Sequence, residues 1–251
     1  MTKIALITGG SRGLGKSMAL HLADRGCDVA ITYRERKDEA DSVVQEIAAK
    51  GRKAAALQLD LEKLDTLDAF VIALKQALQQ HCSVNYVDYL VNNAGMGVYA
   101  SIADTTPAQF DALMNVHLKA PFFLTQKLMS CINDGGHVIN ISSGLARFSY
   151  PNYAAYAMMK GGLEVFTRYL AQELAPRKIA VNTIAPGAIE TDFGGGVVRD
   201  NKELNQMLAN KTALGRVGLP DDIGSAVAGL LTQEPCWING QRIEVAGGIH
   251  L

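Results

Sequence analysis

Tyr156 and Lys160 lie four residues apart in the segment YAAYAMMKGG, with only small and apolar residues between them. On an α-helix, positions i and i+4 share one face, and their Cβ atoms are about 5–6 Å apart. A lysine ammonium at this distance favours the ionised form of a phenol, so the pair predicts a lowered pKa for Tyr156. Such a tyrosine can exchange a proton with a substrate oxygen near neutral pH. The same pair can also be a surface phenol beside a surface amine, so the surrounding elements have to distinguish the two interpretations.

The elements that would position this pair alternate between short apolar runs and longer amphipathic ones. Strands are predicted at Lys3–Thr8, Asp28–Tyr33, Lys53–Gln58, Val87–Asn92, His137–Ile141, Ile179–Ile184 and Arg242–Val245. Helices are predicted at Gly13–Arg25, Lys37–Lys50, Leu64–Gln80 and Pro107–Cys131, the last with an irregularity at Pro121. This alternation implies right-handed crossovers and a parallel sheet covered by helices on both faces. No repeat or Pro/Ser-rich linker interrupts the pattern, so one domain is expected over residues 1–251.

Composition argues against several classes of protein. Lys and Arg total 24 against 25 Asp and Glu, a formal net charge of −1, so no basic excess indicates a nucleic-acid partner. No stretch approaches the roughly 18 apolar residues of a membrane span. The four cysteines are scattered and lack the spacing of a zinc site, so neither a metal site nor a disulfide is predicted. We therefore expect a soluble, cytoplasmic protein.

A glycine-rich turn, TGGSRGLG, follows the first predicted strand and opens the first predicted helix. Gly9, Gly13 and Gly15 allow the backbone to turn tightly and to approach a ligand closely. The free N–H groups at the N-terminus of the following helix favour an anion such as a pyrophosphate. Because the turn sits between a strand and a helix, it predicts a dinucleotide site.

The spacing G-x-x-x-G-x-G, together with Tyr156-x-x-x-Lys160, resembles the classical short-chain dehydrogenase/reductase family over essentially the whole chain. The resemblance implies a Rossmann-type, doubly wound parallel sheet of about seven strands. It also implies an enzyme that interconverts a secondary alcohol and a ketone by hydride transfer with NAD(P)(H).

The resemblance extends to further motifs. Asn92-Asn93-Ala94-Gly95 is similar to the family's NNAG motif, Asp60 stands where members hydrogen-bond the adenine, and Pro186-Gly187 begins the segment that holds the nicotinamide carboxamide. The implied cofactor-binding residues are Gly9, Ser11, Arg12, Gly13, Leu14, Gly15, Tyr33, Arg34, Asp60, Leu61, Asn93, Ala94, Gly95, Tyr156, Lys160, Pro186, Gly187, Ile189 and Thr191.

The end of the second strand indicates which dinucleotide is preferred. NAD enzymes usually place an acidic residue there, which binds the ribose diol and repels a 2′-phosphate. This strand ends in Tyr33-Arg34, and Arg34 and Arg12 could both reach a 2′-phosphate. NADP(H) is therefore the expected cofactor, with NAD(H) open as an alternative because Glu35 is close in sequence.

The resemblance implies that Asn115, Ser143, Tyr156 and Lys160 form the catalytic set. Ser143 lies 13 residues before Tyr156, the family's spacing, whereas Ser142 should point to the other side. Tyr156 would be the general acid/base, Ser143 would bind the substrate oxygen, and Lys160 would bind the nicotinamide ribose. The backbone of Asn115 would anchor a water that links Lys160 to solvent.

Substrate and assembly remain more open. A 3-oxoacyl-thioester reductase and a sugar or polyol dehydrogenase are both compatible with the sequence, and a large planar steroid is disfavoured because the expected substrate lid, Phe193–Thr212, has few aromatic residues. A non-catalytic dinucleotide sensor is the alternative from another class. The resemblance and the apolar surface of 163–174 predict a homotetramer. His81, His117 and His250 are interpreted as packing or surface residues, although His250 could reach a neighbouring subunit's site.

Overall fold

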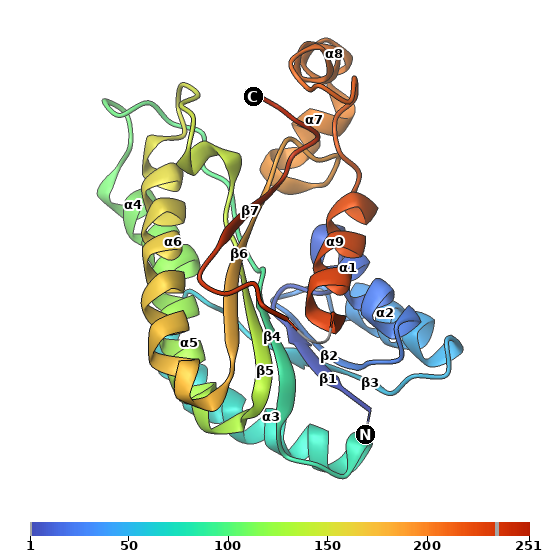
Figure 1. The fold of residues 1–251 in the computed structure, drawn as a ribbon. Coiled ribbons are helices and arrows are strands. Elements are labelled where there is room, and N and C mark those ends of the chain that lie inside the picture. The colour runs from blue at the N-terminus through green and yellow to red at the C-terminus, as the bar shows by residue number, and fades with distance from the viewer. Residues whose placement is uncertain (1, 234–235) are drawn as a thin grey trace.

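Seven parallel strands form one sheet in the order β3-β2-β1-β4-β5-β6-β7 in the computed structural model, which describes residues 2–233 and 236–251 (Figure 1). The strands are β1 (Ile4–Ile7), β2 (Asp28–Tyr33), β3 (Ala54–Gln58), β4 (Val87–Asn92), β5 (Ile132–Ile141), β6 (Ala180–Pro186) and β7 (Arg242–Val245). The α-helices are α1 (Gly13–Asp24), α2 (Lys37–Ala49), α3 (Leu67–Cys82), α4 (Pro107–Met114), α5 (Ala120–Leu128), α6 (Ala154–Leu174), α7 (Val197–Asp200), α8 (Lys202–Asn210) and α9 (Pro220–Thr232).

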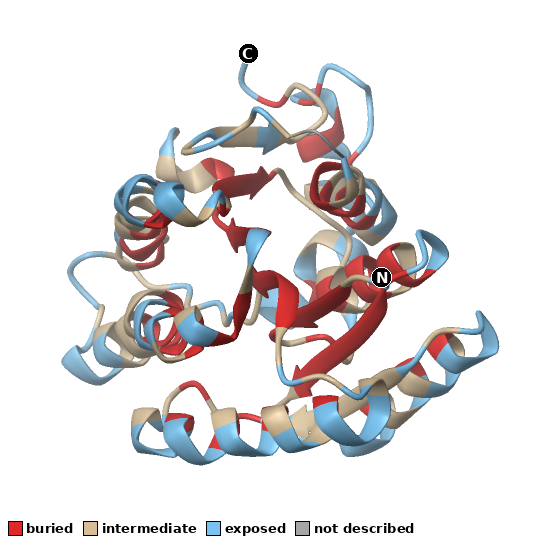
Figure 2. Cartoon of the chain, turned by 60° about the horizontal axis from the view of Figure 1, so that its bottom comes forward, coloured by how far each residue is buried: buried red, intermediate tan, exposed pale blue. Residues whose placement is uncertain are grey.

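The two faces of the sheet have separate apolar cores. Leu6 packs toward α3, α5 and α6, whereas its neighbour Ile7 packs toward α1, α2 and α9, because successive side chains of a strand point to opposite faces. All four residues of β1 are buried, as expected for a central strand covered on both sides. Figure 2 shows the consequence: the central strands are mainly buried, the edge strands β3 and β7 are mostly half-buried, and exposure lies mainly on the outer sides of the helices and in the loops.

The predicted strands and the doubly wound sheet are confirmed, with two local differences. β5 begins at Ile132 instead of His137, and its pairing with β4 shifts register between Val87 and Tyr89. Gly135 within this extension has a φ of +74°, a backbone conformation that accommodates the irregularity.

The second difference lies in the helix predicted at Pro107–Cys131, which is interrupted by a π-helical turn at Asn115–Lys119 and ends in a 3₁₀ turn at Met129–Cys131. The amide of Ala120 donates to the carbonyl of Asn115, five residues earlier. Pro121 follows directly, and it has no amide hydrogen to give to the carbonyl of His117 four residues before it. The irregularity therefore lies on the N-terminal side of the proline that causes it.

The strand order places a ligand-binding site at one edge of the sheet, beyond the carboxyl ends of the strands. β1 pairs with both β2 and β4, so the chain reverses its direction of winding between β1 and β4, and ligands of such sheets bind beyond the carboxyl ends of the strands at this point. Helices α7 and α8 project above that edge, near the C-terminus (Figure 1). Within the described ranges, no helix is long and apolar enough to cross a bilayer.

Candidate active site

A cleft of about 680 Å³ lies at the carboxyl ends of the strands. The predicted residues found on its wall are Gly9, Ser11, Arg12, Gly13, Leu14, Gly15, Tyr33, Arg34, Asp60, Leu61, Asn93, Ala94, Gly95, Ser143, Tyr156, Lys160, Pro186, Gly187, Ile189 and Thr191. Asn115 is the one predicted site residue of the described chain that is absent from this wall. Residues far apart in the sequence are thus brought together in a volume typical of a small-molecule or cofactor site.

One end of the cleft is built from backbone. Gly13 has a φ of +54°, and a Cβ on Gly15 would lie 2.1 Å from the carbonyl oxygen of Gly9, so the turn requires glycine at both positions. The side-chain amide of Asn93 donates to the carbonyls of Thr8 (2.8 Å) and Gly9 (3.1 Å), which fixes the turn against the loop after β4. The result is a cradle at the N-terminus of α1 that fits the diphosphate of a dinucleotide.

Three arginines line this end of the cleft: Arg12 lies in the glycine turn, and Arg34 and Arg36 follow the end of β2. Arg34 is surrounded by acids: its Nη1 donates to Glu62 at 2.5 Å, and its Nε lies 3.3 Å from Glu35 and 3.8 Å from Asp60. The sequence prediction did not include the third arginine, Arg36, because it lies three residues beyond the end of the strand.

Arg12 and Arg36 have fewer acidic neighbours than Arg34 in the described structure. Arg12 lies 3.7 Å from Asp192, and Arg36 pairs with Glu39 at 2.6 Å. These two guanidinium groups are therefore better placed than Arg34 to accept a further anion.

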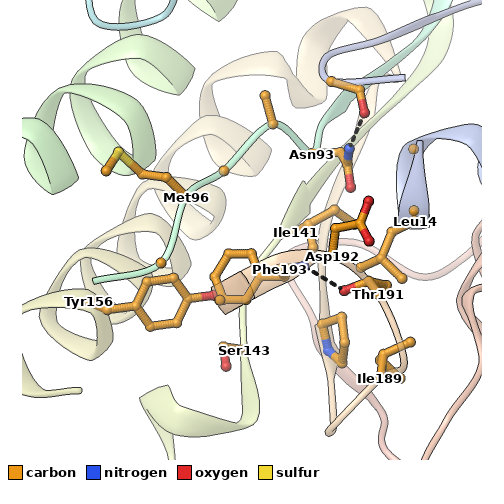
Figure 3. Close-up of a pocket in the computed structure, with 18 of the residues that line it drawn as sticks. Leu14, Asn93, Met96, Ile141, Ser143, Tyr156, Ile189, Thr191, Asp192 and Phe193 are labelled. Carbon is orange, nitrogen blue, oxygen red and sulfur yellow. Dashed lines mark hydrogen bonds between the residues drawn. The ribbon is translucent and has the colours of Figure 1, made fainter. Parts of the chain in front are cut away.

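Tyr156 is buried at the start of α6, and its ring lies 5.8 Å from that of Phe193, centroid to centroid (Figure 3). Burial raises the pKa of this phenol well above its usual value, and a hydrogen bond with Ser143 offsets only part of the increase. The Ser143 hydroxyl also accepts a hydrogen bond from the amide of Leu145 at 3.2 Å. Ser142 instead donates its hydroxyl hydrogen to Glu164 at 2.6 Å.

Lys160 explains why the predicted lowering of the Tyr156 pKa is wrong for the free protein. Its Nζ donates to the carbonyl of Ile141 at 2.7 Å and lies 5.6 Å from the centroid of the Tyr156 ring. Burial lowers the pKa of Lys160 itself to about 7, so the ammonium is only partly populated at neutral pH. Tyr156 therefore retains its proton near neutrality, which suits a proton donor.

The helix turn near Tyr156 presents His117 to the cleft, not Asn115. The imidazole meets the Tyr156 ring edge to face, with centroids 5.1 Å apart. Burial, with a smaller contribution from Lys160, lowers the pKa of His117 to about 3, so the ring is neutral. Asn115 was predicted from its match to the family's fourth catalytic position, in a role for its backbone that the lining of the cleft does not test. His117 was interpreted as a packing or surface residue, because the phase of a helix cannot be counted across a π turn.

The other end of the cleft is built from side chains. Phe148, Tyr150 and Tyr153 come from the loop between β5 and α6, and Phe193 and Leu204 come from the segment predicted as a lid. His250 lines the cleft of its own chain, with its ring 4.4 Å from that of Phe148. The aromatic residues before Tyr156 were not predicted, because nothing local distinguishes them from ordinary loop residues.

The remaining predicted residues flank the two ends. Asp60 accepts a hydrogen bond from the amide of Glu62 at 3.1 Å, and Thr191 accepts one from the amide of Phe193 at 3.2 Å. Gly187 donates its amide hydrogen to Val245 at 3.3 Å. Thr191 thus links the cofactor end of the cleft to the segment beside Tyr156 (Figure 3).

Comparison with known proteins agrees with this geometry. The family model described as enoyl-(acyl carrier protein) reductase, a short-chain dehydrogenase/reductase group, matches residues 9–250. A hydroxynaphthalene reductase-like protein, Arp2 of Metarhizium majus, is 36% identical over 98% of this chain and 94% of its own.

Two solved ketoreductases have the same fold. The promiscuous reductase LugOII, which catalyses keto-reduction at C1 in lugdunomycin biosynthesis, superimposes with a TM-score of 0.94 at 39% identity, over 99% of this chain and 98% of its own. The angucycline C-6 ketoreductase LanV with bound NADP gives a TM-score of 0.93 at 35% identity, over 98% of this chain and 95% of its own. LanV has also been solved with NADP and rabelomycin. From the matching family model, the shared fold and the full-length relatives, we conclude that this chain belongs to the short-chain dehydrogenase/reductase family.

Proposed function

We propose that the protein is an NADP(H)-dependent ketoreductase that reduces a ketone carried on a ring system fused to an aromatic ring. The observation that carries this proposal is the cleft itself, in which Tyr156, Ser143 and Lys160 lie beyond a glycine turn flanked by arginines. The names of the relatives support the substrate class, since one is a hydroxynaphthalene reductase-like protein and another an angucycline C-6 ketoreductase. They give no support to the acyl-thioester and sugar substrates that the sequence left open.

The glycine turn and the arginines fit the cofactor. The backbone cradle at Gly13 and Gly15 would hold the diphosphate, and Arg12 and Arg36 would bind a 2′-phosphate. LanV, with its bound NADP, supports this choice over NAD(H). When bound, NADPH supplies a hydride to the carbonyl carbon.

The chain's own groups would manage the carbonyl oxygen. Tyr156 holds a proton at neutral pH because burial raises its pKa, and it would donate that proton to the oxygen as the alcohol forms. Ser143 would donate a hydrogen bond to the same oxygen. Lys160, close to Tyr156 and held by the Ile141 carbonyl, would bind the ribose hydroxyls and return a proton to the phenol.

The aromatic side chains at the substrate end suit a flat ring system. Phe148, Tyr150, Tyr153 and Phe193 all line the cleft, and aromatic pairs add roughly 0.5–1.5 kcal/mol each beyond the area they bury. Gly194, Gly195 and Gly196 all have positive φ, and we propose that this run lets the segment 193–212 close as a lid.

The test is turnover of a small panel of substrates with each cofactor, followed by the change in NADPH or NADH absorbance. We expect 2-tetralone, whose ketone is carried on a ring fused to benzene, to be reduced with NADPH faster than acetoacetyl thioesters, and glucose with NADP⁺ to give no reaction. If both cofactors bind but no ketone is turned over, the protein is a dinucleotide sensor and the proposal fails.

We propose in addition that the chain forms a homotetramer. Phe122, Phe123, Val165 and Tyr169 on α5 and α6 are exposed, although Leu163 and Leu170 of the same predicted surface are buried in the chain's own core. A self-complementary pairing of two copies would cover this face and give a dimer, and a second pairing, between the last strands, would join two dimers into the tetramer. Light scattering on a gel-filtration column should give about four times the 26.9 kDa chain mass, and Val165→Lys should dissociate the assembly. A wild-type monomer at micromolar concentration would contradict this.

A further inference from the structure

His117 joins two parts of the cleft that are far apart in the sequence. It is 1% exposed, and its ring is nearly perpendicular to that of Tyr156, at 87°. Its Nε2 lies 2.7 Å from the carbonyl oxygen of Met96 and 3.2 Å from the Met96 amide nitrogen. A Cβ on Gly95 would lie 2.8 Å from His117 Cε1, so the loop after β4 packs closely against the ring.

One nitrogen of the His117 ring is buried without a hydrogen-bond partner among the described residues, which packing alone does not explain. The ring is neutral, so only one nitrogen carries a hydrogen, and the short distance to the Met96 carbonyl assigns that hydrogen to Nε2. Nδ1 is then an acceptor, and it is buried without a hydrogen-bond partner among the described residues. Leaving a buried acceptor unpaired lowers stability, a cost that an apolar side chain of similar shape would not have.

The local backbone directs this side chain inward. Asn115 and His117 are two residues apart, so they lie on nearly opposite sides of a helical turn. In the π turn at Asn115–Lys119, His117 is the one of the two that faces the cleft. π turns of this kind occur frequently at functional sites.

We propose that His117 is a positioning residue for Tyr156. Its Nε2 holds the ring on Met96, and the ring in turn fixes the phenol that donates the proton. His117 touches the ring of Tyr156, so it acts through Tyr156 and not on the substrate. The inference rests on the proposed ketoreductase function.

Three substitutions separate the contributions of the ring and its nitrogens. In His117→Gln the side-chain amide reaches the position of Nε2, whereas in His117→Asn it reaches only that of Nδ1, and His117→Ala removes both. We measure kcat and KM with NADPH and 2-tetralone, or with the best ketone of the panel above. His117→Ala should lower kcat by about 10–100-fold, since a misplacement of 1 Å can cost about a hundredfold. KM for NADPH should change less than about threefold, because the backbone cradle is untouched.

The order of the variants identifies the mechanism. His117→Gln should recover most of kcat and His117→Asn should recover little. His137→Ala is the matched control, because it removes another buried histidine ring beside a tyrosine, Tyr89 at 5.7 Å, outside the cleft. It should lower Tm and leave kcat per folded enzyme unchanged.

Several outcomes would overturn the inference. If His117→Asn recovered as much activity as His117→Gln, or if kcat fell only in proportion to Tm, the Met96 contact would not position the phenol. If His117→Ala failed to fold, the comparison of Gln with Asn would still decide. If His117→Ala were fully active and Tyr156→Phe inactive, only this inference would be contradicted. If Tyr156→Phe were active, the proposed function would be contradicted.

Discussion

The two ends of the cleft are made in different ways. At the phosphate end the chain uses backbone: two glycines shape the turn, and Asn93 ties it to the loop after β4. At the substrate end it uses side chains from separate segments, among them Phe148, Phe193 and His250. The first arrangement is specified within a few consecutive residues, and the second only by packing. Substitutions should therefore separate cofactor binding from reduction, with Tyr156 and Lys160 at the boundary.

The largest expected effect comes from Tyr156→Phe, which removes the proton donor and keeps the ring. Turnover should fall by about 10²–10⁴-fold, the usual contribution of general acid catalysis, while the Kd of NADPH stays nearly constant. Stopped-flow reduction and a fluorescence titration of NADPH measure the two quantities. Retention of more than about a tenth of wild-type turnover would remove Tyr156 from the mechanism.

The next effect concerns the buried charge at Lys160 and appears as a pH dependence of stability. Its pKa is about 7 in the folded protein against 10.5 normally, so between these pH values the unfolded chain binds a proton that the folded chain lacks. The free energy of unfolding contributed by this group therefore rises with pH across that window.

Lys160→Met should accordingly have a Tm above that of the wild type at pH 6–7, by several degrees, and this margin should shrink toward pH 10. Thermal melts of the cofactor-free proteins at pH 6, 8 and 9.5 test this. Lys202→Met, on the exposed side of α8, is the control and should show no pH-dependent margin. A margin that is constant with pH would mean that Lys160 has an ordinary pKa in the fold.

A smaller effect should separate the arginines at the phosphate end. Arg12→Ala and Arg36→Ala should each weaken NADPH binding by roughly tenfold, as expected for one charge-assisted hydrogen bond, and leave NADH binding unchanged. Arg34→Ala should weaken NADPH binding by less, because three carboxylates already offset the charge of Arg34. They belong to Glu35, Asp60 and Glu62. A larger loss from Arg34→Ala than from the other two would reverse this assignment.

The smallest effect is expected at Phe193. Its ring touches that of Tyr156, and a Cβ on Gly97 would lie 3.2 Å from it. Phe193→Ala should raise KM for an aryl ketone by about 2–10-fold, the value of one aromatic contact, without changing NADPH affinity. Phe193→Leu, which keeps apolar bulk, should have less effect. Equal losses for aliphatic and aryl ketones would argue against an aromatic wall.

The sheet and the cofactor end could be predicted because their signals are local. The seven strands were found from apolar runs, and Gly13 and Gly15 were found from a turn between a strand and a helix. The substrate end could not be predicted in the same way. The inward position of His117 depends on a π turn, and that of Tyr153 depends on the path of a loop. Arg36 was missed because the side chain reaches back from beyond the strand end.

The loop between β5 and α6 has a consequence for how this enzyme could acquire new substrates. Phe148, Tyr150 and Tyr153 face the cleft but make up neither the glycine cradle nor the Tyr156–Lys160 pair. Substitutions at these positions leave intact both the cradle that would bind NADPH and the proton donor Tyr156. A combinatorial library limited to these three positions is therefore the economical starting point for altering substrate range, and variants from it can be screened with one unchanged cofactor assay.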